Sequence, residues 1–189
     1  MRFHKKLVGK KCYLSSINLQ DAEKWAEWFN DLEVILPLGD EAYTPTSVED
    51  QQATITELIK HNSHVFNVVD LKSNELIGRV GLFQINKTDR NAMFGIVIGE
   101  KDYWNKGYGQ DATKLMLDYG FNLLNLHNIM LGVFAFNSRA ISCYQKVGFK
   151  EIGRRREARI VAGKKYDVVL MDMLAEEFTS VFVKNLIEK

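Results

Sequence analysis

The feature that most limits the fold of this chain is a series of three strand-like runs joined by short polar turns. The runs cover His64 to Leu71, Glu75 to Ile85 and Ala92 to Gly99, and the first is rich in Val and Phe. Lys72 to Asn74 and Lys87 to Asn91 separate them. Connections this short allow only antiparallel pairing of successive strands. The middle of the chain is therefore predicted to form an antiparallel meander.

After the third run, the period of the apolar residues changes to that of a helix. A helix is expected over Gln110 to Leu124, a strand over Asn128 to Phe136 and a second helix over Ser138 to Val147. Two further strands are expected over Lys150 to Val161 and Tyr166 to Leu174. Because a helix that joins two strands of one sheet gives a parallel crossover, the sheet is predicted to be mixed.

The segment before the meander is predicted to add one strand and two helices. The strand covers Lys11 to Ile17, a helix capped by Asn18 or Asp21 follows, and the second helix covers Val48 to Lys60. Leu32 to Ser47 holds both prolines of the chain and is predicted to be a surface loop. Loops on a rigid scaffold often carry specificity.

Length and composition exclude several classes of protein. The 189 residues, of which 46% are hydrophobic, suit one domain over 1–189 with a substantial core. A net charge of +1 gives no global field for a nucleic-acid partner, and no run of about 18 apolar residues predicts a membrane span. The basic start lacks the apolar stretch of a signal peptide, and Cys12 and Cys143 form no metal-binding pattern. A reducing cytoplasm is the expected location.

The stretch Tyr103 to Ala112 places glycines between a strand and a helix. Gly107 and Gly109 let the backbone turn sharply and approach a ligand, and the helix that follows presents unpaired N–H groups, with Lys106 nearby. This combination suits phosphates. The spacing also satisfies the dinucleotide fingerprint GxGxxG/A, but here it follows a meander and the next strand ends without a carboxylate for a ribose. A helix cap without a ligand is the remaining alternative.

A second group of residues opens the helix after the next strand. Asn137 stands where it can cap the helix, and Tyr144 lies seven residues on, two turns along the same face. A phenol in that place can donate a proton to a leaving group. Taken alone, a core tyrosine that bonds a backbone carbonyl is the simpler interpretation.

Together these segments resemble the GNAT acetyltransferases, nearest to the spermidine acetyltransferase and ribosomal-protein alanine acetyltransferase branch. Trp104 to Gly109 matches the family motif Gln/Arg-x-x-Gly-x-Gly/Ala, and the resemblance runs from about Glu75 to Leu174. It implies an α/β (α+β) GNAT fold: a mixed, mostly antiparallel sheet of about seven strands with splayed central strands and flanking helices. The family motif Asn-x-x-Ala…Tyr-x-x-x-Gly-Phe is matched by Asn137, Ala140, Tyr144, Gly148 and Phe149.

The resemblance implies an acyltransferase that moves an acetyl group from acetyl-CoA to a primary amine by direct attack, without a metal. The amine is a protein N-terminal α-amine or a small-molecule amine. Tyr144 is the implied catalytic acid, which protonates the departing thiolate. The implied acetyl-CoA contacts are Ile96, Val97, Ile98, Trp104, Asn105, Lys106, Gly107, Tyr108, Gly109, Gln110, Asn137 and Tyr144.

Two positions depart from the family pattern. Trp104 stands where Gln or Arg is usual, and Met93 stands where many relatives carry a glutamate that helps to remove the amine proton. The base that removes the amine proton is then Glu100, a loop carboxylate at Asp40 or Glu41, or water. Asp40, Glu41 and Met93 are the residues expected to contact the acceptor amine.

Polyamine acetylation is the alternative activity. The spermidine enzymes carry glutamates in the strand that here spans Gly78 to Asn86; this chain has none there, and Arg79 would repel a polycation. An alternative of another class is a non-catalytic CoA-binding sensor module, which the missing glutamate at Met93 favours. A nucleic-acid or membrane partner is not expected, whereas a homodimer is allowed because many relatives are dimers.

Overall fold

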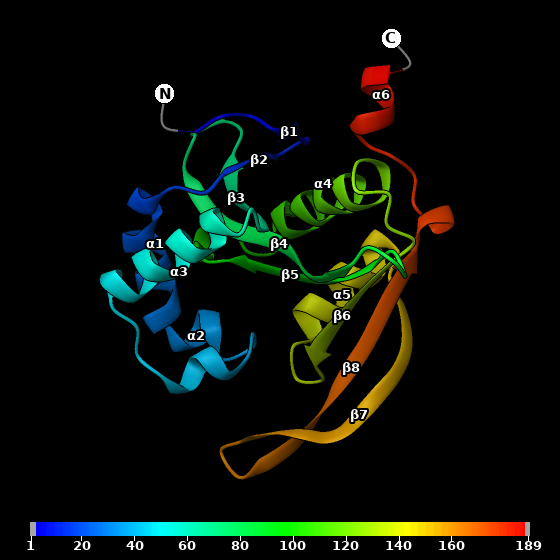
Figure 1. The fold of residues 1–189 in the computed structure, drawn as a ribbon. Coiled ribbons are helices and arrows are strands. Elements are labelled where there is room, and N and C mark those ends of the chain that lie inside the picture. Colours follow the sequence, from blue (N-terminus) through cyan, green and yellow to red (C-terminus); the bar gives the residue numbers. More distant parts are fainter. Residues whose placement is uncertain (1–2, 188–189) are drawn as a thin grey trace.

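The computed structural model describes residues 3–187, and an eight-stranded sheet runs through them (Figure 1). All seven predicted strands are present, and a two-residue strand precedes them. The strand order is β1-β2-β3-β4-β5-β6-β8-β7, and every pair except β5 with β6 is antiparallel. The strands are β1 (Leu7–Val8), β2 (Cys12–Ser16), β3 (His64–Asp70), β4 (Leu76–Asn86), β5 (Asn91–Ile98), β6 (Asn128–Phe134), β7 (Lys150–Val161) and β8 (Lys164–Leu174).

The four predicted helices are confirmed as α1, α3, α4 and α5, and shorter ones join them. Asn18 caps the short turn η1 (Leu19–Asp21) by accepting from the N–H of Gln20, while the Asp21 carboxylate accepts from the N–H of Asn18. The helices are α1 (Ala22–Asn30), α2 (Leu32–Ile35), η2 (Asp40–Tyr43), α3 (Val48–Lys60), η3 (Lys101–Tyr103), α4 (Tyr108–Asn122), α5 (Ser138–Val147), η4 (Ala175–Glu177) and α6 (Val183–Ile187).

The segment predicted as a loop over Leu32 to Ser47 contains α2 and η2, so that prediction is wrong for part of it. The Asp31 carboxylate caps α2 by accepting from the N–H of Glu33. Val34 and Ile35 are buried with the aromatic residues of α1, and this burial stabilises a helix too short to form alone.

Two apolar cores hold the helices against opposite faces of the sheet. Trp25 and Trp28 of α1 and Ile55 of α3 pack on one face, while Leu115 and Met116 of α4 pack on the other. In Figure 1, α1, α2 and α3 lie together on one side of the central strands and α4 on the other. Residues on alternate positions of β4 and β5 enter different cores because successive strand side chains point to opposite faces.

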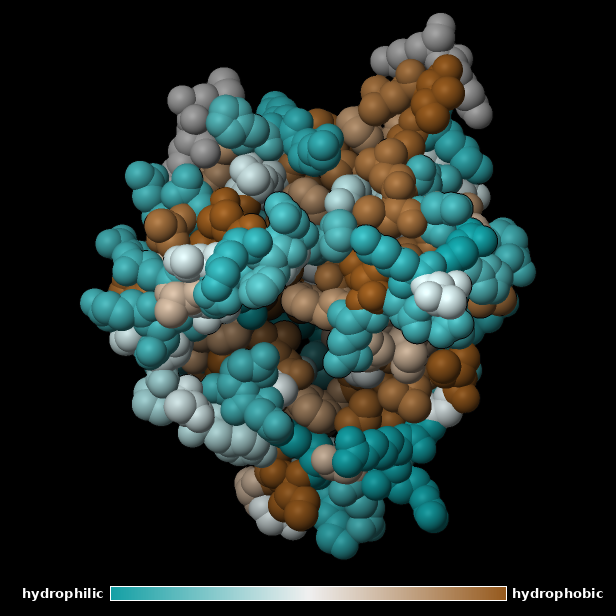
Figure 2. Space-filling view, in the orientation of Figure 1, coloured by the Kyte–Doolittle hydropathy of each residue, from teal (hydrophilic) through white to brown (hydrophobic). Residues whose placement is uncertain are grey.

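The two central strands part after three residues. β5 pairs with β6 only where Asn91–Met93 faces Asn128–Met130, and the register ends there. From Phe94 to Ile98, β5 has no partner on that side, which confirms the predicted splay. Figure 2 shows the surface hollowed near the middle of the face that Figure 1 presents, with apolar residues around the hollow. The splay therefore opens a passage in the sheet.

Candidate active site

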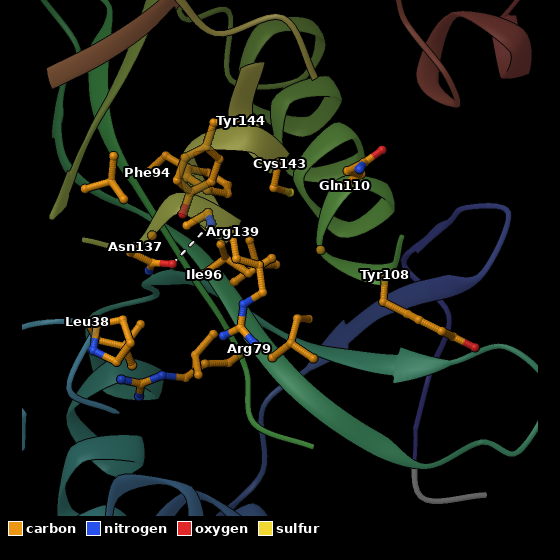
Figure 3. Close-up of a pocket in the computed structure, with 18 of the residues that line it drawn as sticks. Leu38, Arg79, Phe94, Ile96, Tyr108, Gln110, Asn137, Arg139, Cys143 and Tyr144 are labelled. Atoms are coloured by element: carbon orange, nitrogen blue, oxygen red, sulfur yellow. Dashed lines mark hydrogen bonds between the residues drawn. The ribbon is translucent and has the colours of Figure 1, made fainter. Parts of the chain in front are cut away.

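A cavity of about 520 Å³ passes through the gap between β5 and β6 (Figure 3). That volume is in the range of small-molecule sites. The turn that contains Gly107 and helix α5 line one end, which lies on the α4 face of the sheet. The other end is lined from α1, η2 and β4. We call these the turn end and the loop end.

The backbone at the turn end is arranged to bind an anion. Gly107 adopts φ +85°, a left-handed conformation that favours glycine, and α4 begins at the next residue without a side-chain cap. The N–H groups of Tyr108, Gly109 and Gln110 donate to no residue within 3–187. Free N–H groups at a helix N-terminus, together with the helix dipole, favour negatively charged ligands such as phosphates.

Asp111 would oppose an anion at this helix end if its carboxylate faced the cavity. It instead accepts hydrogen bonds from the N–H groups of Lys10, Lys11 and Cys12, at 3.2, 2.7 and 3.1 Å. These bonds tie the turn between β1 and β2 to the start of α4 and engage the negative charge on the side away from the cavity. Sequence reasoning missed this role, because its partners lie about a hundred residues away.

The edge of β5 supplies backbone groups to the cavity. Gly99 donates to the carbonyl of Ile77 at 2.9 Å, so the alternation of an antiparallel ladder directs the backbone of Val97 to Arg79. The backbone groups of Ile96 and Ile98 face the gap instead. The groups of Ile96 are thus open to a ligand that pairs like a strand.

Trp104 and Arg139 close one side of the passage. The Trp104 indole donates to the carbonyl of Ile98 at 2.6 Å, which occupies that acceptor. The guanidinium of Arg139, from α5, lies 3.6 Å from the centre of the Trp104 ring. Both side chains line the cavity. Arg139 was not among the predicted site residues; its position two residues after Asn137 was the only available signal.

Tyr144 lies in the narrow part of the cavity, between the two ends. Its ring packs edge-on against Phe94 at 6.1 Å and Phe149 at 5.8 Å, and the residue is 9% exposed. The hydroxyl makes no hydrogen bond to the residues that the structure describes, and Figure 3 shows it directed toward Asn137. Burial raises the pKa of Tyr144, so the phenol stays protonated at neutral pH. Tyr144 therefore does not bond a backbone carbonyl, as the simpler interpretation of the sequence required.

Asn137 caps α5, as its place in the sequence predicted. Its side-chain oxygen accepts from the N–H of Ala140 at 3.1 Å, the bond drawn in Figure 3. Tyr108, by contrast, turns its phenol away from Tyr144 and donates to Asp70 at 2.7 Å. This bond raises the pKa of Tyr108 to about 12. Tyr108 therefore anchors the turn to β3 and leaves its backbone at the cavity.

The loop end is formed mainly by side chains. Phe29 of α1, Val34 of α2 and Leu38 form apolar walls, and Arg79 and Glu41 bring opposite charges. The guanidinium of Arg79 lies 4.4 Å from the ring centres of both Trp25 and Phe29. Burial lowers the pKa of Arg79 to about 10, while the charge of Glu41 acts in the other direction. Arg79 is thus still protonated at neutral pH.

Of the three residues expected to contact the acceptor amine, the structure places one in the cavity wall and two outside it. Glu41 lines the cavity, but Asp40 does not and pairs with Arg159 of β7 at 2.6 Å. Met93 lies opposite Phe83 and Met130, where β5 and β6 still pair, and is not part of the lining. Glu100 accepts from the Trp28 indole at 2.8 Å and pairs with Lys24 at 2.7 Å, also outside the cavity.

Within residues 3–187 no cluster of three or more His, Cys, Asp or Glu side chains is placed to hold a metal ion. None of the helices in that range has both the length and the apolar composition needed to cross a bilayer. The cysteines are free, with Cys12 buried and Cys143 half-buried in the cavity wall. Burial raises the pKa of Cys143 to about 11, which keeps the thiol neutral.

Comparison with known proteins places this geometry in context. The family model described as an acetyltransferase (GNAT) domain matches residues 11–150. The uncharacterized N-acetyltransferase p20 of Bacillus licheniformis is 26% identical over 174 residues, covering 91% of this chain and 97% of that protein. Spermidine N(1)-acetyltransferase of Vibrio cholerae is 34% identical over 124 residues, 62% of this chain and 71% of the relative.

Solved structures agree with the sequence comparison. The crystal structure of spermidine N-acetyltransferase from Vibrio cholerae in complex with CoA and spermine superposes with a TM-score of 0.80 at 29% identity. The superposition covers 88% of this chain and 96% of that one. The family match over residues 11–150 includes β5, β6 and the α4 turn, and the superposition extends over most of both chains.

Proposed function

The chain belongs to the GNAT acetyltransferase family and is an acetyl-CoA-dependent N-acetyltransferase, and on this premise we propose how its residues carry the reaction. The observation that carries the proposal is the parted pair of strands β5 and β6. Amides at one end of the gap and a phenol in its middle have no hydrogen-bond partner among residues 3–187. This arrangement suits a thioester with a nucleotide tail.

The turn end holds the pyrophosphate of acetyl-CoA in this proposal. The amides of Tyr108, Gly109 and Gln110 donate to the phosphate oxygens, and Lys106 adds a positive charge beside them. The left-handed turn at Gly107 directs the chain into α4, so that these amides come at its first turn. These are the contacts predicted for the segment Lys106 to Gln110.

The pantetheine arm pairs with the free edge of β5. Ile96 offers its backbone groups and Ile98 its N–H, while Val97 contributes the strand geometry but directs its own groups to β4. Asn137 stands across the gap at the start of α5. Acetyl-CoA supplies the acetyl group as a thioester, and an N–H of this edge is placed to stabilise charge on its carbonyl oxygen.

Tyr144 acts as the general acid. Its hydroxyl is protonated, has no partner within residues 3–187, and belongs to the lining of the passage. A phenol held in this way donates its proton to the departing thiolate of CoA. The rings of Phe94 and Phe149 fix its orientation.

The acceptor amine enters from the loop end and attacks the thioester directly. Among the carboxylates considered from the sequence, Glu41 is the one in the cavity wall, so we assign to it the removal of the amine proton, directly or through water. Asp40 pairs with Arg159 instead, and Met93 lies opposite Met130 where β5 and β6 still pair. A protein N-terminus or a small-molecule amine is the proposed acceptor, and a homodimer remains a prediction.

Thiol release from acetyl-CoA tests the proposal. The full chain is mixed with acetyl-CoA and a panel of amines that covers amino acids, short peptides, aminoglycosides and polyamines, and free thiol is measured against a reaction without amine. CoA binding is measured separately by calorimetry. We expect binding, and amine-dependent release with at least one class. Tight binding without turnover on any class would favour the sensor module, and absence of binding would refute the site itself.

A further inference from the structure

Arg79 has an unusual position for an arginine at the floor of a substrate cavity. It projects from β4 on the face that α1 covers, and Figure 3 shows its side chain reaching toward Leu38. Its guanidinium is stacked on Trp25 and Phe29 at 4.4 Å from each ring centre. The rings fix the plane of the guanidinium, while the cavity remains in contact with it.

The charge of Arg79 is not paired. No hydrogen bond or ion pair joins its side chain to any residue between positions 3 and 187, and the charge of Glu41 acts on it without a direct contact. Arg159, another arginine in contact with two aromatic rings, donates from Nη1 to the carboxylate of Asp40 and from Nη2 to the carbonyl of Gly39, although its Nε is buried without a partner among residues 3–187. Two nitrogens of Arg159 therefore have acceptors in that range, whereas the guanidinium of Arg79 has none there.

An unpaired guanidinium in contact with aromatic rings is costly, because the rings replace water around it without accepting its hydrogen bonds. Cation–π contact offsets part of that cost, but the N–H groups, which lie in the plane of the guanidinium, remain without acceptors. Those N–H groups form a planar fork that matches a carboxylate. The geometry thus fits an anion that arrives with the substrate.

We propose that Arg79 binds a carboxylate of the acceptor, so that the acceptor is an amine that also carries a carboxylate next to an apolar group. The inference rests on the proposed acetyl transfer and specifies its substrate class. Phe29, Val34 and Leu38 supply the apolar walls, and Glu41 stands near the amine. An amino acid with an apolar side chain has all three features. A polyamine has no carboxylate, and each of its charges is repelled by Arg79.

Matched acceptors that differ only in the carboxylate test the proposal. L-phenylalanine is compared with L-phenylalaninamide and phenethylamine, L-leucine with L-leucinamide, and spermidine serves as the polyamine. We expect kcat/KM for the acids to exceed that for the amides by about tenfold, the effect of one hydrogen-bonded ion pair. The amine of an amide is the less basic one, so basicity alone would give the opposite order.

Variants of Arg79 separate recognition from structure. In Arg79→Met and Arg79→Lys the acid-to-amide ratio of kcat/KM should fall toward one, with Lys retaining part of it because it keeps the charge but loses the planar fork. Arg156→Gln, at an exposed arginine of β7, is the matched control and should keep the wild-type ratio. CoA affinity measured on each variant establishes that it is folded.

The outcomes distinguish this inference from the proposed function. Amine-dependent thiol release with amides or spermidine preferred to the acids, or an unchanged acid-to-amide ratio in Arg79→Met, would overturn the carboxylate role and leave acetyl transfer in place. Absence of release with every amine would instead refute the proposed function. A purely structural Arg79 would lower the melting temperature and all kcat/KM values together without changing the ratio.

Discussion

The turn end and the loop end of the cavity present different kinds of groups to a ligand. At the turn end the ligand-facing groups are backbone amides, held by one glycine turn and the start of α4 within a few consecutive residues. At the loop end they are side chains from α1, α2, η2 and β4, which lie far apart in the sequence. The turn end can keep one geometry for one cofactor, while the loop end can change residue by residue.

This difference explains why the two ends differ in what they recognise. A backbone site for a pyrophosphate needs glycine at few positions and tolerates Trp104 in place of the usual Gln or Arg, because Trp104 binds a strand carbonyl rather than the phosphate loop. At the loop end a single side chain, such as that of Arg79, sets the charge of the pocket, so one substitution can change that charge. Substrate choice is thus expected to vary among relatives that share acetyl-CoA.

The largest effect is expected for Tyr144→Phe, at the point where the two ends meet. Removing the hydroxyl should lower kcat about 100-fold, the usual contribution of a general acid. CoA affinity should change little because the rings of Phe94 and Phe149 still hold the aromatic side chain. The steady-state rate of thiol release gives kcat, and calorimetry gives the affinity for CoA.

The pH profile of the wild type provides the control. Because burial raises the pKa of Tyr144, the acid stays protonated past its ordinary value of about 10, and the rate should rise with pH as the amine loses its proton, without a descending limb. If Tyr144→Phe turns over at the wild-type rate, the phenol has no catalytic role and water protonates the thiolate.

The next effect belongs to the turn end alone. Gly107→Val should weaken CoA binding about 30-fold, because a branched residue is strained at φ +85° and its Cβ would crowd Cε of Lys11 at 3.3 Å, so the turn that presents the amides must shift. Gly163→Val is the matched control: Gly163 has φ +75° in the β7–β8 turn with no atom near its absent Cβ. Equal CoA affinity in both variants would contradict the phosphate-binding role of the turn.

The sequence predicted the turn end better than the loop end for a physical reason. Short turns dictate antiparallel pairing, and a strand followed by glycines and a helix dictates free amides, so local pattern is enough for β3 to β5 and for Gly107. The cap at Asn137 is likewise local.

The loop end depends on contacts over long sequence separations. Asp40 and Glu41 are adjacent in the chain, yet only Glu41 faces the cavity, because Arg159 of β7 draws Asp40 aside. The stacking of Arg79 on α1 and the bonds of Asp111 to the β1–β2 turn are similarly non-local. No spacing rule joins residues about 50 to 120 positions apart, so these features had to come from the structure.

A smaller effect than either of these is expected from Arg159→Met, which acts on the loop end at a distance. Arg159 is 5% exposed, stacks on Tyr43 and Phe134, and bonds Asp40 and the carbonyl of Gly39. Methionine keeps much of the apolar contact but frees η2, so the acceptor KM should rise about three- to tenfold, the cost of ordering one short segment on binding. Acceptor KM and CoA affinity are measured on the same preparation.

The pairing with Asp40 adds little by itself, because the Asp40 side chain is 96% exposed and water screens the pair. Asp40→Asn should therefore have a smaller effect than Arg159→Met, and Arg154→Met, at an exposed arginine of the same strand, should have none. CoA affinity should be unchanged in all three, because the turn end is made of groups that none of them touches. A loss of CoA affinity in Arg159→Met would mean that the two ends are coupled through β6, and the separation drawn between them would fail.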